Sequence, residues 1–126
     1  MFNKKEEKLE CLIGANCSFE GQIDTKGTIR IDGIVKGNVK ADWIILGENA
    51  RIHGDLSAKG AIVGGAITGN ILAKDNLEIK QTGKVNGDIK STKLSIIEGG
   101  IFEGNSSLYK QDSVVVDIQS KEAVSD

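Results

Sequence analysis

The sequence of 126 residues contains no proline, only one histidine and two cysteines, and aromatic residues make up 4% of the chain. Its longest apolar runs, residues 43–46 and 114–116, are far shorter than the roughly 20 residues of a membrane-spanning helix. Met1 is not followed by the apolar core of a signal peptide. These absences predict one small soluble domain in the cytoplasm.

An excess of one charge is also missing, because 16 basic residues are set against 18 acidic ones and the net charge is -2. The chain has no basic stripe with interleaved aromatic residues, so we expect no nucleic-acid partner. Cys11 and Cys17 are six residues apart and far in sequence from His53, which is not the spacing of a zinc site. We expect no metal or cofactor, and two ordinary, partly buried thiols.

What the chain has instead is glycine, 16 residues in total, and six of them lie in a repeated pattern. The pattern is apolar, any residue, Gly, polar, apolar, and only the last copy departs from it, with Ser106 at the final apolar position. The intervals between these glycines are 16, 17, 15, 18 and 17 residues: Gly21, Gly37, Gly54, Gly69, Gly87 and Gly104. Alternating apolar pairs lie between the copies, so each repeat predicts about three short strands.

Units of this length cannot bury a core alone, but stacked copies bury a continuous apolar column. The sequence therefore predicts an all-β, single-domain parallel β-helix of about six coils over residues 12–110, with flexible tails at 1–11 and 111–126. The tail at 111–126 is acidic, with one lysine and four carboxylates. The predicted core column consists of Val35, Ile52, Ile67, Val85, Val39, Leu56, Ile71 and Ile89.

The polar residue after each repeated glycine is an independent indication of stacking. In chain order these residues are Gln22, Asn38, Asp55, Asn70, Asp88 and Asn105, so no carboxylate follows another. In coils about 4.8 Å apart, stacked carboxylates would repel, whereas an intervening Asn can donate amide hydrogen bonds along the row. The same register places Lys36 beside Glu20 and Lys40 beside Asp24.

An enzymatic interpretation stays open beside this one: a left-handed β-helix acyltransferase of the hexapeptide-repeat type, with His53 as the base. That fold needs a strict period of six and coils of about 18 residues. The observed intervals of 15 to 18 do not keep this period. A phosphate-binding loop is disfavoured as well, because Asn70 stands where the motif after Gly64 and Gly69 needs lysine.

Two stretches resemble the bactofilin family, GTIRIDGIVKGNV at residues 27–39 and IIEGGIFEG at residues 96–104. With the repeated Gly-Asp/Asn-Ile corners, the resemblance covers roughly residues 12–108. It implies a right-handed parallel β-helix that assembles end to end, without nucleotide, into non-polar bacterial cytoskeletal filaments. It also implies a position at the inner face of the cytoplasmic membrane and a role in organising cell-shape or cell-wall machinery.

Neither end of the predicted rod has a proline or a clear amphipathic helix that would cap it. An uncovered terminal coil favours growth by end-on docking, and the resemblance adds that like ends pair. We predict that the polymer interface includes Phe19, Ile101, Phe102, Leu108 and Tyr109.

The segment before the rod resembles the short N-terminal membrane-targeting peptides of many bactofilins. We expect Met1, Phe2, Lys4 and Lys5 to contact anionic lipid of the inner membrane, with a merely disordered tail as the alternative. The expected partners are further copies of the chain, this lipid, and cell-wall enzymes or other scaffold proteins.

Overall fold

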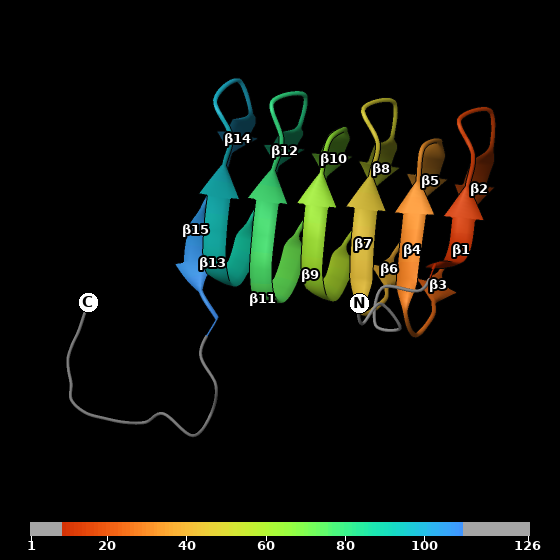
Figure 1. Cartoon of the computed structure of the whole chain (residues 1–126), viewed down its shortest axis with the longest axis horizontal. Coiled ribbons are helices and arrows are strands. Elements are labelled where there is room, and N and C mark those ends of the chain that lie inside the picture. Colours follow the sequence, from red (N-terminus) through yellow and green to blue (C-terminus); the bar gives the residue numbers. More distant parts are fainter. Residues whose placement is uncertain (1–8, 110–126) are drawn as a thin grey trace.

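The computed structural model describes residues 9–109 as a rod made of β-strands (Figure 1). Within this range the chain has no helix, and therefore none that could cross a membrane. The strands are β1 (Leu9–Ile13), β2 (Ser18–Glu20), β3 (Ile23–Asp24), β4 (Thr28–Ile31), β5 (Ile34–Lys36), β6 (Val39–Lys40), β7 (Trp43–Leu46), β8 (Arg51–His53), β9 (Leu56–Val63), β10 (Ala66–Thr68), β11 (Ile71–Ile79), β12 (Lys84–Asn86), β13 (Ile89–Ile96), β14 (Ile101–Glu103) and β15 (Ser106–Leu108).

The strands form a parallel β-solenoid of six turns, which confirms the predicted fold. One sheet takes one strand from each turn, in the order β14, β12, β10, β8, β5, β2. The other sheet covers the two remaining faces, because long strands such as β9 bend and pair first with β6 and then with β7. Each turn in Figure 1 rises on the near face, crosses to the fainter far face and descends while advancing toward the C-terminus, so the winding is right-handed.

The solenoid begins at Leu9, three residues before the predicted domain start at residue 12, because β1 pairs with β4 from this residue onward. At the other end the structure describes the chain as far as Tyr109. The two predicted tails therefore lie largely outside the described residues.

The uneven spacing of the repeated glycines comes mainly from the loops between the first and second strand of each turn, and an extra residue in β11 between Ala73 and Asn76 lengthens the interval from Gly69 to Gly87. This loop has two residues at 32–33 and 64–65, but four at 14–17, 47–50, 80–83 and 97–100. The two short loops fall in the two shortest intervals, of 16 and 15 residues. The longer loops project at the upper edge of the rod in Figure 1, so the strands keep their register without a strict sequence period.

The repeated glycines form the sharp corner between the second and third strand of each turn. All six have positive φ, between 139° and 151°, a conformation that other residues rarely adopt. A Cβ at Gly54 would also collide with the backbone carbonyl oxygen of Gly37 in the preceding turn. The backbone conformation demands glycine in all six copies, and in the five copies after Gly21 the close stacking on the preceding turn demands it as well.

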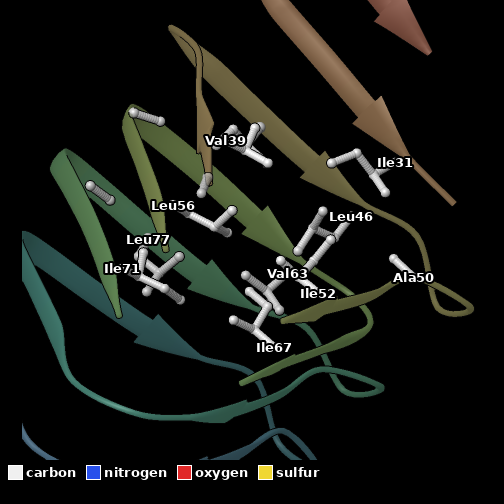
Figure 2. Packing of buried hydrophobic residues seen from close by; sticks show 14 of the residues in the cluster. Ile31, Val39, Leu46, Ala50, Ile52, Leu56, Val63, Ile67, Ile71 and Leu77 are labelled. Carbon is white, nitrogen blue, oxygen red and sulfur yellow. The ribbon is translucent and has the colours of Figure 1, made fainter. Parts of the chain in front are cut away.

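The predicted core column is confirmed. Val35, Ile52, Ile67 and Val85 are successive partners on β5, β8, β10 and β12, and each is at most 1% exposed. Figure 2 shows Ile52 and Ile67 stacked in one column and Leu56 and Ile71 in another. The apolar interior is therefore continuous along the rod axis.

The polar residues after the repeated glycines also stack, but their hydrogen bonds differ from the expectation. The backbone N–H of Asp55 donates to Oδ1 of Asn38 (3.2 Å), that of Asn70 to Oδ1 of Asp55 (3.0 Å), and that of Asp88 to Oδ1 of Asn70 (3.2 Å). The side-chain oxygens accept, since each of these N–H groups faces the preceding turn. Among the described residues, no Asn amide in this row donates along it.

Of two further local expectations, the one for the cysteines was only partly right, and the one for the stacked charged residues is confirmed. Cys11 is half-buried as expected, but Cys17 is exposed because it lies in the projecting loop 14–17. Glu20 pairs in register with Lys36, and Asp24 with Lys40. Neither pair forms an ion pair; within residues 9–109 the ion pairs join Arg30 to Asp32 and Lys80 to Glu78.

Candidate polymerisation interface

The last turn of the solenoid continues the buried columns but is not covered by another turn of the described chain. Ile96 stacks on Ile79, and exposure rises from 0% at Ile79 to 44% at Ile96. Leu108 stacks on the buried Ser91 and is 57% exposed. The C-terminal end therefore presents core-type side chains at a surface, which is the composition of a dry contact rather than of a solvated one.

Phe102 lies at the centre of this end. It occupies the position of Val85 in the preceding turn, points inward and is half-buried against the core. A phenylalanine is larger than the valine and isoleucines below it in the column, so its ring closes the column and supplies apolar area at the tip. The prediction that this residue lies at the rod end is consistent with its position on the edge strand β14.

The first turn forms the opposite end. Phe19 points inward over Val35 from the edge strand β2 and is 36% exposed. Its ring folds back to lie 3.5 Å from the place a Cβ of Gly21 would take. Ile13 is almost fully buried and Ile23 is half-buried. The two ends of the rod are therefore chemically similar, since apolar side chains of the interior lie at both.

Backbone groups add a second component at both ends. The edge strands β1 and β2 pair with β4 and β5 on one side only, and β14 and β15 pair only with β12 and β13 within the described chain. Their outward N–H and C=O groups are available to a further strand. An incoming turn of matching register would satisfy these groups and cover the apolar column together.

The remaining predicted interface residues have different positions. Ile101 pairs with the outward Lys84, so its side chain lies on the outer face of the last turn, 46% exposed. Tyr109 follows β15, and its N–H donates to the carbonyl oxygen of Ser91 at 3.0 Å. Met1, Phe2, Lys4 and Lys5 lie outside the described residues.

Ile96 is not among the residues predicted from the sequence to lie at the rod end. Leu94 and Ile96 repeat the apolar pair of Leu77 and Ile79, so the pattern predicts an ordinary core pair. The pattern alone does not show that no further turn covers it. Its exposure becomes visible only when the last turn is placed in the rod.

The segment with phosphate-loop spacing has no free amides at its key positions. The N–H of Gly64 donates to the carbonyl oxygen of Leu46 at 2.8 Å, and that of Gly69 to Asn86 at 3.0 Å. These groups hold neighbouring turns together, so they cannot cradle a phosphate. His53 is exposed on the outer face, as its outward position in the repeat predicts. Across residues 9–109, no three His, Cys, Asp or Glu side chains are grouped to hold a metal ion.

Comparison with known proteins agrees with this geometry. The family model for bactofilins, described as polymer-forming cytoskeletal, matches residues 11–107. Bactofilin BacO of Myxococcus xanthus is 32% identical over 95 residues, 75% of this chain and 75% of that protein. Bactofilin BacP of the same organism is 26% identical over 94 residues, 74% of this chain and 39% of that protein.

A solved structure has the same fold. The cryo-EM reconstruction of Thermus thermophilus bactofilin double helical filaments matches with a TM-score of 0.73 and 24% identity. The match covers 79% of this chain and 99% of that chain. The parallel β-solenoid is therefore shared along nearly the whole length of that protein.

Proposed function

We propose, from the premise that this chain belongs to the bactofilin family of polymer-forming cytoskeletal proteins, that it assembles end to end through its two uncovered terminal turns. The observation that carries this proposal is the exposure of inward-facing residues on the last turn, above all Ile96 and Leu108. Fully burying an exposed aliphatic side chain contributes about 1.5 to 3 kcal/mol, and because Ile96 and Leu108 are already about half buried, covering each one contributes about half of that. A few of them, with the edge-strand hydrogen bonds, are enough for a stable contact.

The family membership also decides between the two interpretations of the sequence. Bactofilins are non-enzymatic cytoskeletal proteins, so the acyltransferase alternative is set aside. The exposed position of His53 on the outer face agrees with this.

The assembly we propose is non-polar and needs no nucleotide. Like ends dock, so that the C-terminal turn of one copy meets the C-terminal turn of the next, and the N-terminal ends meet in the same way. Such a contact is self-complementary, because Phe102 and Leu108 of each copy cover the column of the other. The use of the Gly64 and Gly69 amides inside the solenoid supports the independence from nucleotide.

Negative-stain electron microscopy of the purified chain without nucleotide tests assembly directly. We expect long filaments for the wild type and folded short oligomers for Phe102→Arg, because a guanidinium would be buried without a partner in the dry contact. Thr68→Arg is the matched control, since it adds the same charge at an exposed outward position on β10 in the middle of the rod. It should leave the filaments unchanged.

Two outcomes would contradict the proposal. Unchanged long filaments of Phe102→Arg would remove this residue from the interface, and equal loss of filaments in Thr68→Arg would indicate a general charge effect. Circular dichroism of both variants establishes that the solenoid is folded in each.

We further propose that the filament lies at the inner face of the cytoplasmic membrane, held by Met1 and Phe2 with support from Lys4 and Lys5. Two apolar side chains contribute about 2 to 3 kcal/mol each at most, and a lysine near anionic lipid about 1. One copy would bind weakly, but a filament presents many copies and binds by multivalency. Cell-wall enzymes or other scaffold proteins are the partners that such a filament would organise.

Sedimentation with anionic vesicles tests the membrane proposal. We expect the wild type to pellet, and both Phe2→Ala and the assembly-deficient Phe102→Arg to stay largely in solution. Equal pelleting of all three would contradict the link between assembly and membrane binding. Absence of pelleting for the wild type would contradict membrane binding itself.

A further inference from the structure

Strand β7 is apolar on both of its faces, unlike the strands around it. Ile44 and Leu46 point into the core and are buried, while Trp43 and Ile45 alternate with them on the outer face and are only half-buried. A strand with no polar face is typical of a sheet that is covered on both sides. On the outer face, Ile45 is stacked on Ile62 of the next turn. The charged residues Arg30 and Glu78 lie on either side of this apolar pair in the same row.

The outer side chains of β7 form a patch with their neighbours, which we call the outer patch: Thr28, Trp43, Ile45 and Ile62. Trp43 is the partner of Thr28 on β4 and of Gly60 on β9, and Ile45 is the partner of Ile62. A Cβ on Gly60 would lie 2.5 Å from the Trp43 ring, so the indole occupies the space that a side chain at this position would need. The patch lines a hollow of about 450 Å³.

Thr28 lies at the base of the hollow. It is only 4% exposed, and its Oγ1 makes no hydrogen bond within the described part of the chain. Because this oxygen has almost no exposed surface, an occupant of the hollow meets mainly the apolar surfaces of Trp43, Ile45 and Ile62. A segment of polypeptide that carries an aromatic or aliphatic side chain can cover these surfaces.

The position and length of the chain outside the structure identify this segment. Leu9 is the register partner of Thr28, so residues 1–8 enter the rod one turn away from the outer patch. With turns about 4.8 Å apart, the patch lies roughly 5 to 14 Å from Leu9, whereas eight extended residues span about 26 Å. The segment carries an aromatic residue, Phe2, seven positions before Leu9.

We propose that residues 1–8 fold back over the outer patch of their own subunit and that the Phe2 ring packs against Trp43 in the hollow. Aromatic pairs of this kind are favourable beyond the area they bury. The outer patch is thereby a docking site for this chain's own N-terminal segment. Covering the patch prevents nonspecific association of its apolar surface with other proteins.

The docking has a consequence that rests on the proposed membrane function. Phe2 cannot occupy the hollow and a lipid bilayer at the same time. Anionic membrane and the outer patch therefore compete for the same residue, and lipid binding uncovers Trp43.

Fluorescence tests the docking without lipid, because Trp43 is the only tryptophan of the chain. We compare Phe102→Arg with the double variant that also carries Phe2→Ala, so that assembly does not cover the patch. The Phe2→Ala change is expected to shift the emission of Trp43 to longer wavelength and to increase its quenching by acrylamide. Val115→Ala is the matched control, an apolar residue in the C-terminal segment, and should change neither.

Two results would overturn the docking. One is equal emission and quenching with and without Phe2. The other is protection of Trp43 that grows with protein concentration and survives Phe2→Ala, which would show that a second copy covers the patch. If Phe102→Arg does not fold, the same comparison is made on the otherwise wild-type chain at concentrations too low for assembly.

Vesicles of phosphatidylglycerol and phosphatidylcholine separate this inference from the membrane proposal. If the vesicles bind the wild type, we expect the quenching of Trp43 to rise toward the Phe2→Ala value, and binding without any rise would overturn the competition. If the vesicles do not bind while Phe2→Ala still uncovers Trp43, the membrane proposal fails and the docking stands.

Discussion

The inner turns and the terminal turns of this solenoid have the same kind of interior, yet only the inner turns are covered by a neighbouring turn on both sides. Val85 and Phe102 are consecutive members of one column, as are Ile79 and Ile96. The first member of each pair is fully buried, and the second is partly open. The proposed interface at the end thus consists of ordinary core residues, and it differs from the interior only in lacking a further turn above it within the described chain.

This comparison explains how a repeat protein can polymerise without a specialised binding site. Most repeat rods need polar terminal repeats to remain soluble single molecules. Within residues 9–109 neither end has such a cap, and the strands at both ends leave one row of backbone groups unpaired. The same forces that stack one turn on the next inside the chain therefore act between chains.

We expect the largest difference in unfolding free energy between an inner and an end position when a glycine is replaced by alanine. Gly54→Ala should lower the free energy of unfolding by about 2 to 6 kcal/mol, from backbone strain and the collision with the Gly37 carbonyl together. Gly14→Ala, in the first loop, is the control, because the atom nearest to its Cβ would be Cys17 Sγ at 3.9 Å. Urea denaturation measures both, and equal stability of the two variants would refute the stacked corner.

A smaller difference in lost stability is expected when two isoleucines that point into the interior are each replaced by alanine. Ile67→Ala should cost about 2 to 4 kcal/mol, because it leaves a cavity in the buried column. Ile96→Ala should cost less than about 1 kcal/mol in the unassembled chain, since the side chain is already half in solvent. Denaturation in the Phe102→Arg background, which keeps the chains apart, measures both values. Similar losses would mean that the last turn is covered.

The smallest difference concerns charge on the outer corner. Asn70→Asp places a carboxylate between Asp55 and Asp88 while keeping an acceptor for the Asp88 N–H, and should cost about 1 kcal/mol for each neighbour. Asn105→Asp on the last turn has only Asp88 beside it and should cost about half as much.

Both losses should shrink in high salt, because mobile ions screen the repulsion between stacked carboxylates. Urea denaturation at low and high salt checks this. A loss that persists unchanged in high salt would show that the amide itself, rather than the absence of charge, is needed at this corner.

Much of the fold could be predicted because it is a local pattern repeated six times. A glycine at each corner, a polar residue after it and apolar pairs between corners are sufficient to predict parallel stacking. The direction of the hydrogen bonds at Asn38, Asp55 and Asn70 could not be predicted in the same way. It depends on where each backbone N–H points once the turns are stacked, which side-chain chemistry alone does not reveal.

The sequence by itself determined the repeat, the buried column and the family, because these depend on residue type and spacing along the chain. Only the tertiary structure decided which apolar residues are interior and which are surface. Ile79 and Ile96 have the same place in the pattern, and Ile44 and Ile45 are neighbours in one run. Their difference in exposure depends on whether another turn lies above them and on which face of the sheet they occupy, and both are properties of the stacked rod.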